Sequence, residues 1–444
     1  MVKVIVAKEK FNSEHLLGTY LDESHYDILV EEDTDCYMPA ISDLTSANDS
    51  EKFDERQIAF KFRKNYFTQT EQDQAYIGLR EAATESQNRG LAAGPRGEIL
   101  STTGRKGRDW VNDYELAILD HFLDDGSKLI YDVNVDTLRE QFKNNKMDVD
   151  ENRGKVWLRS EVTKVYPEYH GWFDNWVDSI KNESREVQKA EATKVAENWI
   201  SVTNYAKSVY SGVAGWYDRY PRIPYGRATS YTEKNPDKFA MAYPFLQSLN
   251  RGFKDLMPWR WGNQKAAADK LDKRFLVPET VFTTITVNKS FRTAAHRDAG
   301  DLNAGLSNLL VVGSGEYTGG YLIFPEYRVA VNVRPGDLLL VNNHEIIHGN
   351  TEIKLNHDKA ERISLVCYFR EKMLELKSWP YESLRRQFVE ERKSNKDHPM
   401  WRPLWNGVSP GMWETQEWRD YLTKHNMKDE DGVVGVAGSL EDFF

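Results

Sequence analysis

The segment from Val281 to Arg370 alternates short β-rich runs with turns, and this pattern limits the folds that are open to the chain. One run, at 362–369, reads RISLVCYF, and Gly, Pro and Asn separate it and its neighbours from one another. Short strands with frequent turn residues are typical of β-sandwiches and barrels. We therefore expect this segment to form the core and the remaining residues to pack around it.

Three potential metal ligands lie in this segment. His296 and Asp298 form an H-x-D pair at the end of one predicted strand, and His348 follows 52 positions later at the start of another. Because alternate side chains of a strand share a face, His296 and Asp298 can point at one ion while Arg297 points away. Two imidazoles and one carboxylate, with open positions left on the ion, are typical of non-haem Fe(II) oxygenases. The pattern predicts an iron site.

Two other histidines, His344 and His357, compete with His348 for the third position. We prefer His348 because Gly349-Asn350-Thr351 follow it and because it lies closest to the next strand. The alternative role for His344 is that of a core histidine or of a residue just outside the ligand set.

Open positions on such an ion suit a bidentate 2-oxo acid together with O2. Arg362 can form the bidentate ion pair that a guanidinium favours with a carboxylate, as binding of 2-oxoglutarate would require. Ser364 lies two positions further on the same face and can add a hydrogen bond. Asn288 lies in a strand rich in Thr and Val, where Asn is disfavoured, so we predict that it binds the co-substrate or the substrate.

The segment from about 215 to 370 resembles the TET and J-binding-protein family of Fe(II)/2-oxoglutarate dioxygenases. The likeness includes TVNKSFRTAAHRDAGD at 286–301 and RISLVCYFRE at 362–371, and the further stretches 224–250, 260–270 and 315–352. It is closer to the J-binding-protein and phage branch than to the animal enzymes. The resemblance implies that His296, Asp298 and His348 hold iron and that Arg362 holds 2-oxoglutarate. It also implies oxidation of the 5-methyl group of thymine or 5-methylcytosine in DNA, without saying which base.

The expected fold class is α+β. We predict a double-stranded β-helix, or jelly roll, at 275–372, flanked by N- and C-terminal helical elements. Residues 1–125 are interpreted as an accessory region with acidic and basic loops, 126–274 as a mostly helical lead-in, and 373–444 as a C-terminal helical extension. Within that extension, the sequence pattern indicates helices at 381–393 and 414–427.

Composition excludes several other classes of protein. No apolar run approaches the ~18 residues of a membrane span, and the N-terminus lacks the apolar centre of a signal peptide. With only Cys36 and Cys367 in 444 residues, a disulfide framework is not expected. We expect a soluble protein of a reducing cytoplasm, which would be the host cytoplasm if the chain is phage-encoded.

Charge is distributed unevenly along the chain. The net charge is −10, and residues 1–60 contribute −9 of it, with 14 acidic against 5 basic side chains. The remainder is almost neutral, so local basic patches can face a phosphate backbone. A glycine-rich loop at 86–110 and a segment rich in Arg and Tyr at 209–231 supply the predicted DNA contacts, although an ordinary solvated loop at 86–110 is an equal alternative. The predicted contact residues are Arg96, Arg105, Lys106, Arg108, Arg222 and Arg227.

The resulting hypothesis is a dioxygenase that uses Fe(II), 2-oxoglutarate and O2 to hydroxylate a 5-methylpyrimidine in DNA. Because stacking hides that methyl group in a duplex, the base is expected to be flipped out or single-stranded. Two alternatives stay open: a 2-oxoglutarate oxygenase that acts on a small molecule, free nucleotide or protein, and a non-catalytic DNA-binding module. The oligomeric state is not indicated.

Overall fold

The computed structural model describes residues 2–7, 9–38, 57–86, 90–94, 209–219, 223–398 and 412–428. The chain divides into two compact units, of which the first comprises Met1–Pro95, Lys207–Glu391 and Gly411–Phe444. Almost all of the described residues belong to this first unit, and it holds the elements discussed below apart from the last three residues of the helix at 379–394. The apolar spacing at 110–126 and 182–207 also predicts helices, and both segments lie outside the described residues.

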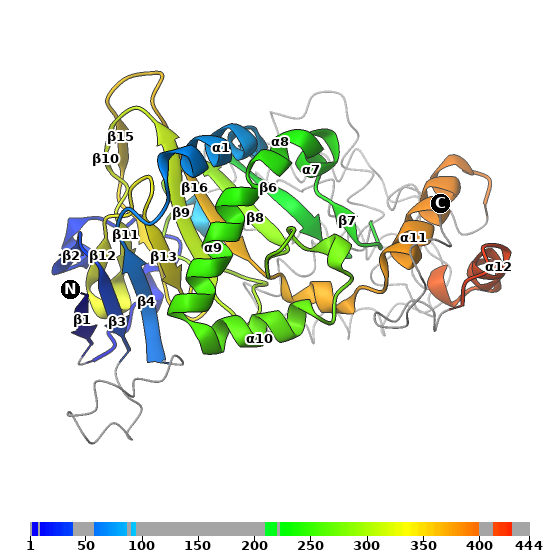
Figure 1. Cartoon of the computed structure of the whole chain (residues 1–444), viewed down its shortest axis with the longest axis horizontal. Helices are drawn as coiled ribbons and strands as arrows, with labels where there is room; N and C mark the ends of the chain where they lie inside the picture. Colours follow the sequence, from blue (N-terminus) through cyan, green and yellow to red (C-terminus); the bar gives the residue numbers. More distant parts are fainter. Residues whose placement is uncertain are drawn as a thin grey trace, which may run out of the picture. The chain divides into compact units, whose positions relative to one another are not determined.

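A mixed sheet of ten strands is the largest element of this unit (Figure 1). Its order is β1-β3-β4-β13-β9-β16-β8-β6-β5, with β7 attached to β6, and all neighbours are antiparallel except β1 and β3. The strands are β1 (Lys3–Val6), β3 (Thr34–Tyr37), β4 (Ile58–Arg63), β5 (Thr84–Ser86), β6 (Val209–Tyr217), β7 (Arg227–Ala228), β8 (Thr284–Lys289), β9 (Ser307–Ser314), β13 (Leu338–Val341) and β16 (Glu361–Tyr368).

A smaller sheet faces one side of the large one. It has the order β14-β11-β12-β2, and a separate pair, β10 with β15, projects beyond it (Figure 1). The bounds are β2 (Ile28–Val30), β10 (Tyr317–Gly319), β11 (Leu322–Phe324), β12 (Val329–Val331), β14 (Gly349–Asn350) and β15 (Ile353–Leu355). One buried cluster joins the two sheets, and in it the rings of Phe60 and Phe324 stack with centroids 5.3 Å apart.

Helices cover the other side of the large sheet. In β16, Ile363, Leu365 and Cys367 belong to the cluster that packs against these helices, whereas Val366 packs in the cluster between the sheets. This alternation places positions 362 and 364 on the face toward the smaller sheet. The helices are α1 (Gln69–Leu79), α7 (Ser230–Lys234), α8 (Pro236–Met241), α9 (Tyr243–Leu256) and α10 (Pro258–Ala268).

The amphipathic pattern of α9 explains how this layer is held. Its buried side chains include Phe245, Leu249 and Phe253, each four residues apart, and Leu246, three residues before Leu249, so the four share one face. The stripe packs into the same cluster as the helix-facing residues of the large sheet. The helices thereby leave the opposite face of the sheet for the site.

The C-terminal helices were predicted from sequence and are confirmed. The pattern at 381–393 corresponds to α11 (Trp379–Ser394), and that at 414–427 corresponds to α12 (Gln416–Lys424). Shorter 3-10 helices are η1 (Glu14–Leu16), η2 (Glu23–His25), η4 (Arg80–Ala82), η5 (Gly90–Ala93), η6 (Lys273–Phe275), η7 (Pro325–Tyr327), η8 (Glu371–Glu375) and η9 (Met412–Glu414). Among the described residues, no helix combines the length and the apolar character needed to cross a bilayer.

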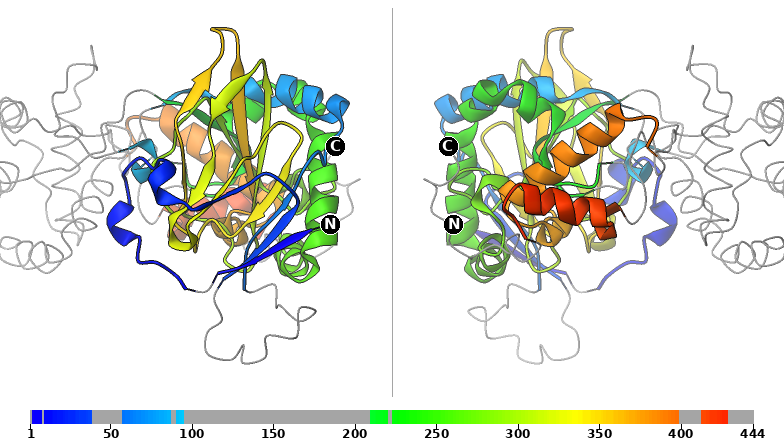
Figure 2. Two further views of the ribbon diagram at one scale, coloured as in Figure 1. Left: turned by 90° about the vertical axis from the view of Figure 1, so that its left-hand side faces the viewer. Right: turned by 90° about the vertical axis from the view of Figure 1, so that its right-hand side faces the viewer.

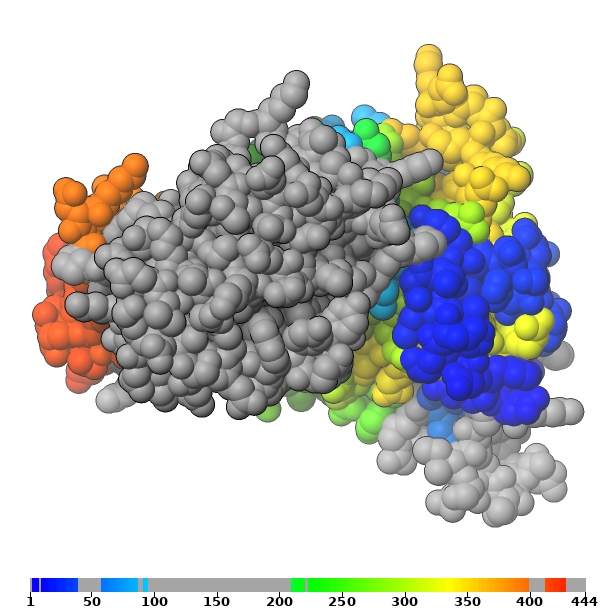
Figure 3. All heavy atoms as spheres, turned by 180° about the vertical axis from the view of Figure 1, so that it is seen from behind, coloured from blue at the N-terminus to red at the C-terminus, as the bar shows by residue number. Residues whose placement is uncertain are grey.

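The α+β class is confirmed, and the predicted boundaries at 125, 274 and 372 remain predictions. Strands from three of the four predicted regions form the large sheet, since β1, β3, β4 and β5 precede residue 126 and β6 precedes β8. The N-terminal residues (blue) lie beside the strands of the smaller sheet (yellow) when the molecule is viewed from its side and from behind (Figures 2 and 3). They are thus part of the same compact unit as the predicted core.

Candidate metal centre

His296, Asp298 and His348 lie together at the edge of the smaller sheet. One potential ligand atom from each lies within 4.8 Å of the other two. The Nε2 atom of His296 is 3.4 Å from Asp298 Oδ1, and that of His348 is 3.9 Å from Asp298 Oδ2. Two imidazoles and a carboxylate that converge on one point have the composition of a facial triad. The structure therefore brings together the three residues that the sequence singled out.

Backbone pairing joins the two segments that carry these ligands. His296 and His348 exchange two backbone N–H to carbonyl hydrogen bonds, each 2.9 Å long, in an isolated antiparallel bridge. The strand predicted to end at 296–298 is thus reduced to an isolated bridge, with a further backbone hydrogen bond from Asn350 to the carbonyl of Thr293 at 3.0 Å. Gly349 permits this approach: a Cβ atom there would lie 2.9 Å from the carbonyl carbon of Ala294.

Both imidazoles are oriented in the same way. His296 Nδ1 lies 2.7 Å from the carbonyl oxygen of Ala294, and His348 Nδ1 lies 3.0 Å from that of Ile346. A carbonyl oxygen only accepts, so Nδ1 carries the proton in each ring and donates it. The Nε2 atoms are left facing Asp298, with a lone pair available whenever the ring is neutral.

The electrostatics of the cluster favour a cation. Burial, together with the charge of His296, lowers the pKa of His348 to about 4, so this ring is neutral near pH 7. Burial opposes ionisation of Asp298 and His296 too, but their mutual hydrogen bond, their opposite charges and further hydrogen bonds together outweigh it. The pKa of Asp298 is therefore lowered and that of His296 is raised. Asn343 Nδ2 also donates to Asp298 Oδ2 at 3.1 Å. A metal ion would replace the proton on His296 and meet one carboxylate and two neutral imidazoles.

Arg362 is a buried cation that lacks an acidic partner in the described part of the chain. Its residue is 4% exposed, and its Nε atom has no hydrogen-bond partner. Its Nη2 atom donates only a long hydrogen bond of 3.5 Å to the carbonyl of Gly320, and its guanidinium lies 5.7 Å from the ring centre of Tyr317. Because a buried charge is costly unless it is paired, this arrangement favours an anionic ligand.

Ser364 and Asn288 lie next to each other on neighbouring strands. Ser364 of β16 is the register partner of Asn288 of β8, which in turn pairs with Ser211 of β6. Ser211 Oγ donates a hydrogen bond to Asn288 Oδ1. These residues form a polar row on the face that also carries Arg362.

Comparison with known proteins identifies the segment that carries this site. Residues 184–371 match the model of the Tet_JBP family, described as the oxygenase domain of the 2OGFeDO superfamily. This segment is a Tet_JBP oxygenase domain. Its curated relatives include thymine dioxygenase JBP1-B of Trypanosoma cruzi, which is 36% identical over 165 residues that cover 36% of this chain and 19% of the relative.

Other curated relatives of the Tet_JBP domain include proteins of Leishmania and Crithidia. The bifunctional helicase and thymine dioxygenase JBP2 of Leishmania tarentolae is 34% identical over 186 residues, covering 41% of this chain and 16% of the relative. The chain therefore spans about a fifth of the length of these relatives. Among solved structures, NgTET1 in complex with 5mC DNA has 18% identity and a TM-score of 0.31, covering 37% of this chain and 61% of that chain.

The two rival histidines lie apart from the ligand cluster of the Tet_JBP domain. His344 Nε2 is 3.8 Å from Glu345 Oε1, and His357 Nδ1 accepts a hydrogen bond from the backbone N–H of Lys359. Neither belongs to the group of converging ligand atoms found among the described residues. The geometry supports His348 as the third member.

The predicted DNA contacts of the Tet_JBP domain and its flanks are described at one position. Arg96, Arg105, Lys106, Arg108 and Arg222 lie outside the described residues. Arg227 lies in β7, where its Nη1 atom donates to the carbonyl of Asp218 at 2.8 Å and its guanidinium lies 5.4 Å from the ring centre of Tyr217. A phosphate at Arg227 would have to compete with these contacts, and all six contacts remain predictions.

Two polar residues beside the ligands of the Tet_JBP domain were missed as site residues. Asn343 donates a hydrogen bond to Asp298, and its place five residues before His348 gave no signal because the contact joins two segments that lie far apart in the sequence. Asp301 is buried and accepts a hydrogen bond from Ser307 Oγ. Burial and the nearby charge of Asp298 raise the pKa of Asp301 to about 7.

The close approach at Gly349 gives a testable prediction. In Gly349→Ala the added methyl group would lie 2.9–3.1 Å from backbone atoms of Ala294 and Ala295, so the two ligand-bearing segments must separate. We expect a destabilisation of about 1–3 kcal/mol, the usual cost of overpacking, together with weaker metal binding. The measurements are thermal unfolding and calorimetric titration with Co(II).

A matched control is Gly262→Ala in α10, where nothing lies within 4 Å of the added Cβ. Because Ala is a better helix former than Gly, this change should leave metal binding unaltered and stability equal or higher. Equal metal affinity in both variants would show that the contact at Gly349 does not set the ligand geometry.

Proposed function

We propose that the chain is an Fe(II)/2-oxoglutarate-dependent dioxygenase that hydroxylates the 5-methyl group of a pyrimidine in DNA. The observation that carries this proposal is the occurrence, in one Tet_JBP domain, of a converging His-Asp-His cluster and a buried arginine without an acidic partner among the described residues. The first fits a divalent metal ion, and the second fits the far carboxylate of 2-oxoglutarate.

The strand order supports a double-stranded β-helix as the framework. From β8 to β16 the chain crosses repeatedly between the sheets: β8, β9, β13 and β16 lie in the large sheet, whereas β11, β12 and β14 lie in the smaller one. His296 pairs beside β14, so its segment extends the smaller sheet between β8 and β9. Eight segments shared between two facing sheets are the pattern of a jelly roll, and all of them fall within the predicted 275–372.

His296, Asp298 and His348 would hold the iron from one side and leave the other side for the co-substrate and O2. When bound, iron and 2-oxoglutarate would supply the activation of O2 that hydroxylation of a methyl group requires. The chain's own contribution is to hold neutral Nε2 donors and an ionised carboxylate in place, through the carbonyls of Ala294 and Ile346 and the amide of Asn343.

Arg362 would pair with the 2-oxoglutarate carboxylate that does not bind the metal. Its unpartnered Nε and its weakly bonded Nη2 are adjacent donors of one guanidinium, as a bidentate ion pair requires. Ser364 lies on the same face and would add a hydrogen bond. Asn288 already accepts from Ser211, so its amide group is the part that would remain for a ligand.

The names of the curated relatives favour thymine as the base. The matched proteins of Trypanosoma, Leishmania and Crithidia are named thymine dioxygenases, and 5-methylcytosine is the alternative substrate. Because base stacking would hide the methyl group from a metal held between two sheets, the base must leave the stack or be single-stranded.

The proposal is tested by measuring succinate formed from 2-oxoglutarate, with and without DNA, at two salt concentrations. We expect iron-dependent succinate formation that rises when DNA is added and falls again at high salt, because phosphate contacts weaken as salt increases. Succinate formation at the same rate with and without DNA would instead point to a small-molecule or protein substrate. If the protein forms no succinate in an iron-dependent way, with or without DNA, it is a non-catalytic module.

A further inference from the structure

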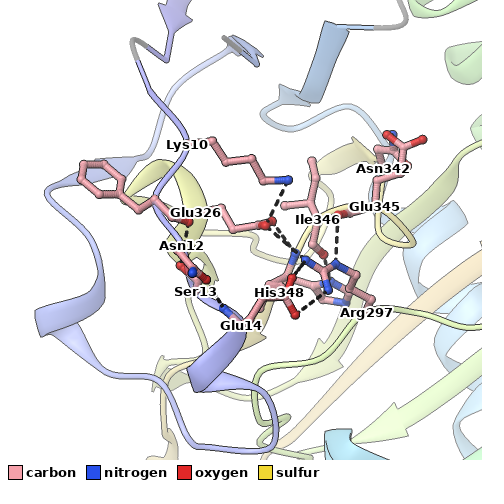
Figure 4. A network of polar contacts seen from close by, with 12 residues as sticks. Lys10, Asn12, Ser13, Glu14, Arg297, Glu326, Asn342, Glu345, Ile346 and His348 are labelled. Carbon is pink, nitrogen blue, oxygen red and sulfur yellow. Dashed lines mark hydrogen bonds and ion pairs between the residues drawn. The ribbon is translucent and has the colours of Figure 1, made fainter. Parts of the chain in front are cut away.

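Arg297 lies between two predicted metal ligands in sequence, and its guanidinium enters a network of polar contacts with Glu14, Glu326 and the carbonyl of Glu345 (Figure 4). Its Nε atom donates to the backbone carbonyl of Glu345 at 3.1 Å. Glu345 lies three residues before His348, so this contact ties the H-x-D segment to the turn that leads into the third ligand.

Glu326, in η7 between β11 and β12, makes a second link between the same two segments. Its Oε2 atom accepts a hydrogen bond from the backbone N–H of Ile347 at 2.8 Å, directly beside His348. Its Oε1 atom lies 3.3 Å from Arg297 Nη2. The Glu326 side chain is only 3% exposed, so solvent screens these contacts weakly.

The N-terminal segment completes the network from outside. Glu14 of η1 accepts two hydrogen bonds from Arg297, at 2.6 and 3.2 Å. Lys10 Nζ lies 3.1 Å from Glu326 Oε1, and the N–H of Phe11 donates to the carbonyl of Glu326 at 2.9 Å. Further along, Gly18 donates a backbone hydrogen bond to the carbonyl of Ala295, next to His296.

Each ligand-bearing segment is thus held on the side away from the ligands. Arg297 belongs to one segment and contacts the other, and Glu326 is hydrogen-bonded to Arg297 and to the residue preceding His348. Outer contacts of this kind orient metal ligands, and their loss commonly costs about 10–100-fold in metal affinity.

We propose that Arg297 and Glu326 are positioning residues of the metal centre, and that the N-terminal segment 10–19 stabilises them through Glu14 and Lys10. This inference rests on the proposed metal-binding function. It gives the acidic N-terminal region a role in forming the metal centre, although that region lies more than 270 residues before the ligands in the sequence.

Substitution of Arg297 separates positioning from simple charge. Arg297→Gln removes a positive charge near the metal ion. Loss of that Coulomb repulsion alone would make metal binding tighter. A positioning role predicts the opposite, because the links to Glu345, Glu326 and Glu14 are lost. We expect about tenfold weaker binding of Co(II) by the full chain, measured by calorimetry, and an altered visible absorption spectrum of bound Co(II).

Two exposed N-terminal carboxylates offer a matched pair of milder variants. Glu14 makes a bidentate contact with Arg297, whereas Asp27 makes a similar contact with Arg328, two residues after Glu326. Both side chains are more than half exposed, so neither Glu14→Gln nor Asp27→Asn should unfold the protein. We expect Glu14→Gln to weaken Co(II) binding by roughly two- to threefold, within the range for an exposed ion pair, and Asp27→Asn to have no effect.

Several results would overturn the inference. Equal or tighter Co(II) binding in Arg297→Gln, with the wild-type spectrum, would show that the network has no part in forming the metal centre. A similar loss of affinity in Glu14→Gln and Asp27→Asn would show a general effect of N-terminal contacts on the fold. Wild-type protein that binds no Co(II) would instead overturn the proposed metal-binding function itself, and this inference with it.

Discussion

Replacing His296 with Ala, or Asp298 with Asn, is expected to abolish DNA-dependent succinate formation because either change removes a metal ligand. Loss of an outer contact costs about 10–100-fold in metal affinity, so loss of a ligand itself should exceed roughly 100-fold. Asp298→Asn is the sharper variant, since it keeps the size of the side chain and removes the only carboxylate of the cluster. Calorimetric titration with Co(II) measures the affinity without depending on turnover.

The rival histidines supply the controls. His344→Ala and His357→Ala should retain metal binding and turnover, because neither side chain belongs to the ligand cluster. His348→Ala should behave like His296→Ala. If His344→Ala lost the metal while His348→Ala kept it, the third ligand would have been assigned wrongly. Wild-type metal affinity in Asp298→Asn would contradict the whole site.

Arg362→Ala is expected to weaken 2-oxoglutarate binding strongly while leaving the metal in place. Removing one partner of a buried, hydrogen-bonded charge pair costs about 2–5 kcal/mol, which corresponds to roughly 30-fold or more in affinity. The effect should appear as a higher 2-oxoglutarate concentration for half-maximal succinate formation. It should also appear as weaker 2-oxoglutarate binding to protein that holds a metal ion.

Arg362→Lys tests the geometry of this contact. Lysine keeps the charge but not the planar pair of donors, so its affinity for 2-oxoglutarate should fall between those of wild type and Arg362→Ala. Titration with Co(II) should give the same affinity in all three proteins. An unchanged 2-oxoglutarate dependence in Arg362→Ala would exclude this residue as the carboxylate partner.

The ligand cluster could be predicted from sequence because its signals are local. His296 and Asp298 are two positions apart, and Arg297 does point away from the ligand atoms, as the alternation of an extended segment requires. The strand pattern of RISLVCYF likewise predicted that Arg362 and Ser364 lie on the same face of the sheet. In each case a short stretch of backbone decides the direction of the side chain.

The surroundings of the cluster could not be predicted in the same way. Glu326 meets Arg297 and Ile347, and Glu14 meets Arg297 from a segment far away in sequence. Nothing in the periodicity near Glu14 or Glu326 indicates these contacts, because they depend on how β2, β11 and β12 come together. The same holds for β3 and β4, which extend the large sheet although their sequence indicated only a separate accessory region.

Arg227 illustrates a further limit of sequence patterns. Arginines among tyrosines are typical of nucleic-acid-binding surfaces, but this one lies over Tyr217 and donates to the backbone of Asp218. Burial also lowers its pKa. An arginine that packs on a ring within the fold and an arginine that is free to bind a phosphate can have the same local sequence, so the pattern does not distinguish them.

The most direct test of the proposed function is to measure whether the DNA base gains oxygen. The protein would be incubated with Fe(II), 2-oxoglutarate, O2 and two DNAs, one with thymine only and one that also contains 5-methylcytosine, and the nucleosides would then be analysed by mass spectrometry. We expect a mass gain of one oxygen atom on a 5-methylpyrimidine, with thymine favoured, that is absent in Asp298→Asn. Continued succinate formation with no oxidised base in either DNA would contradict it.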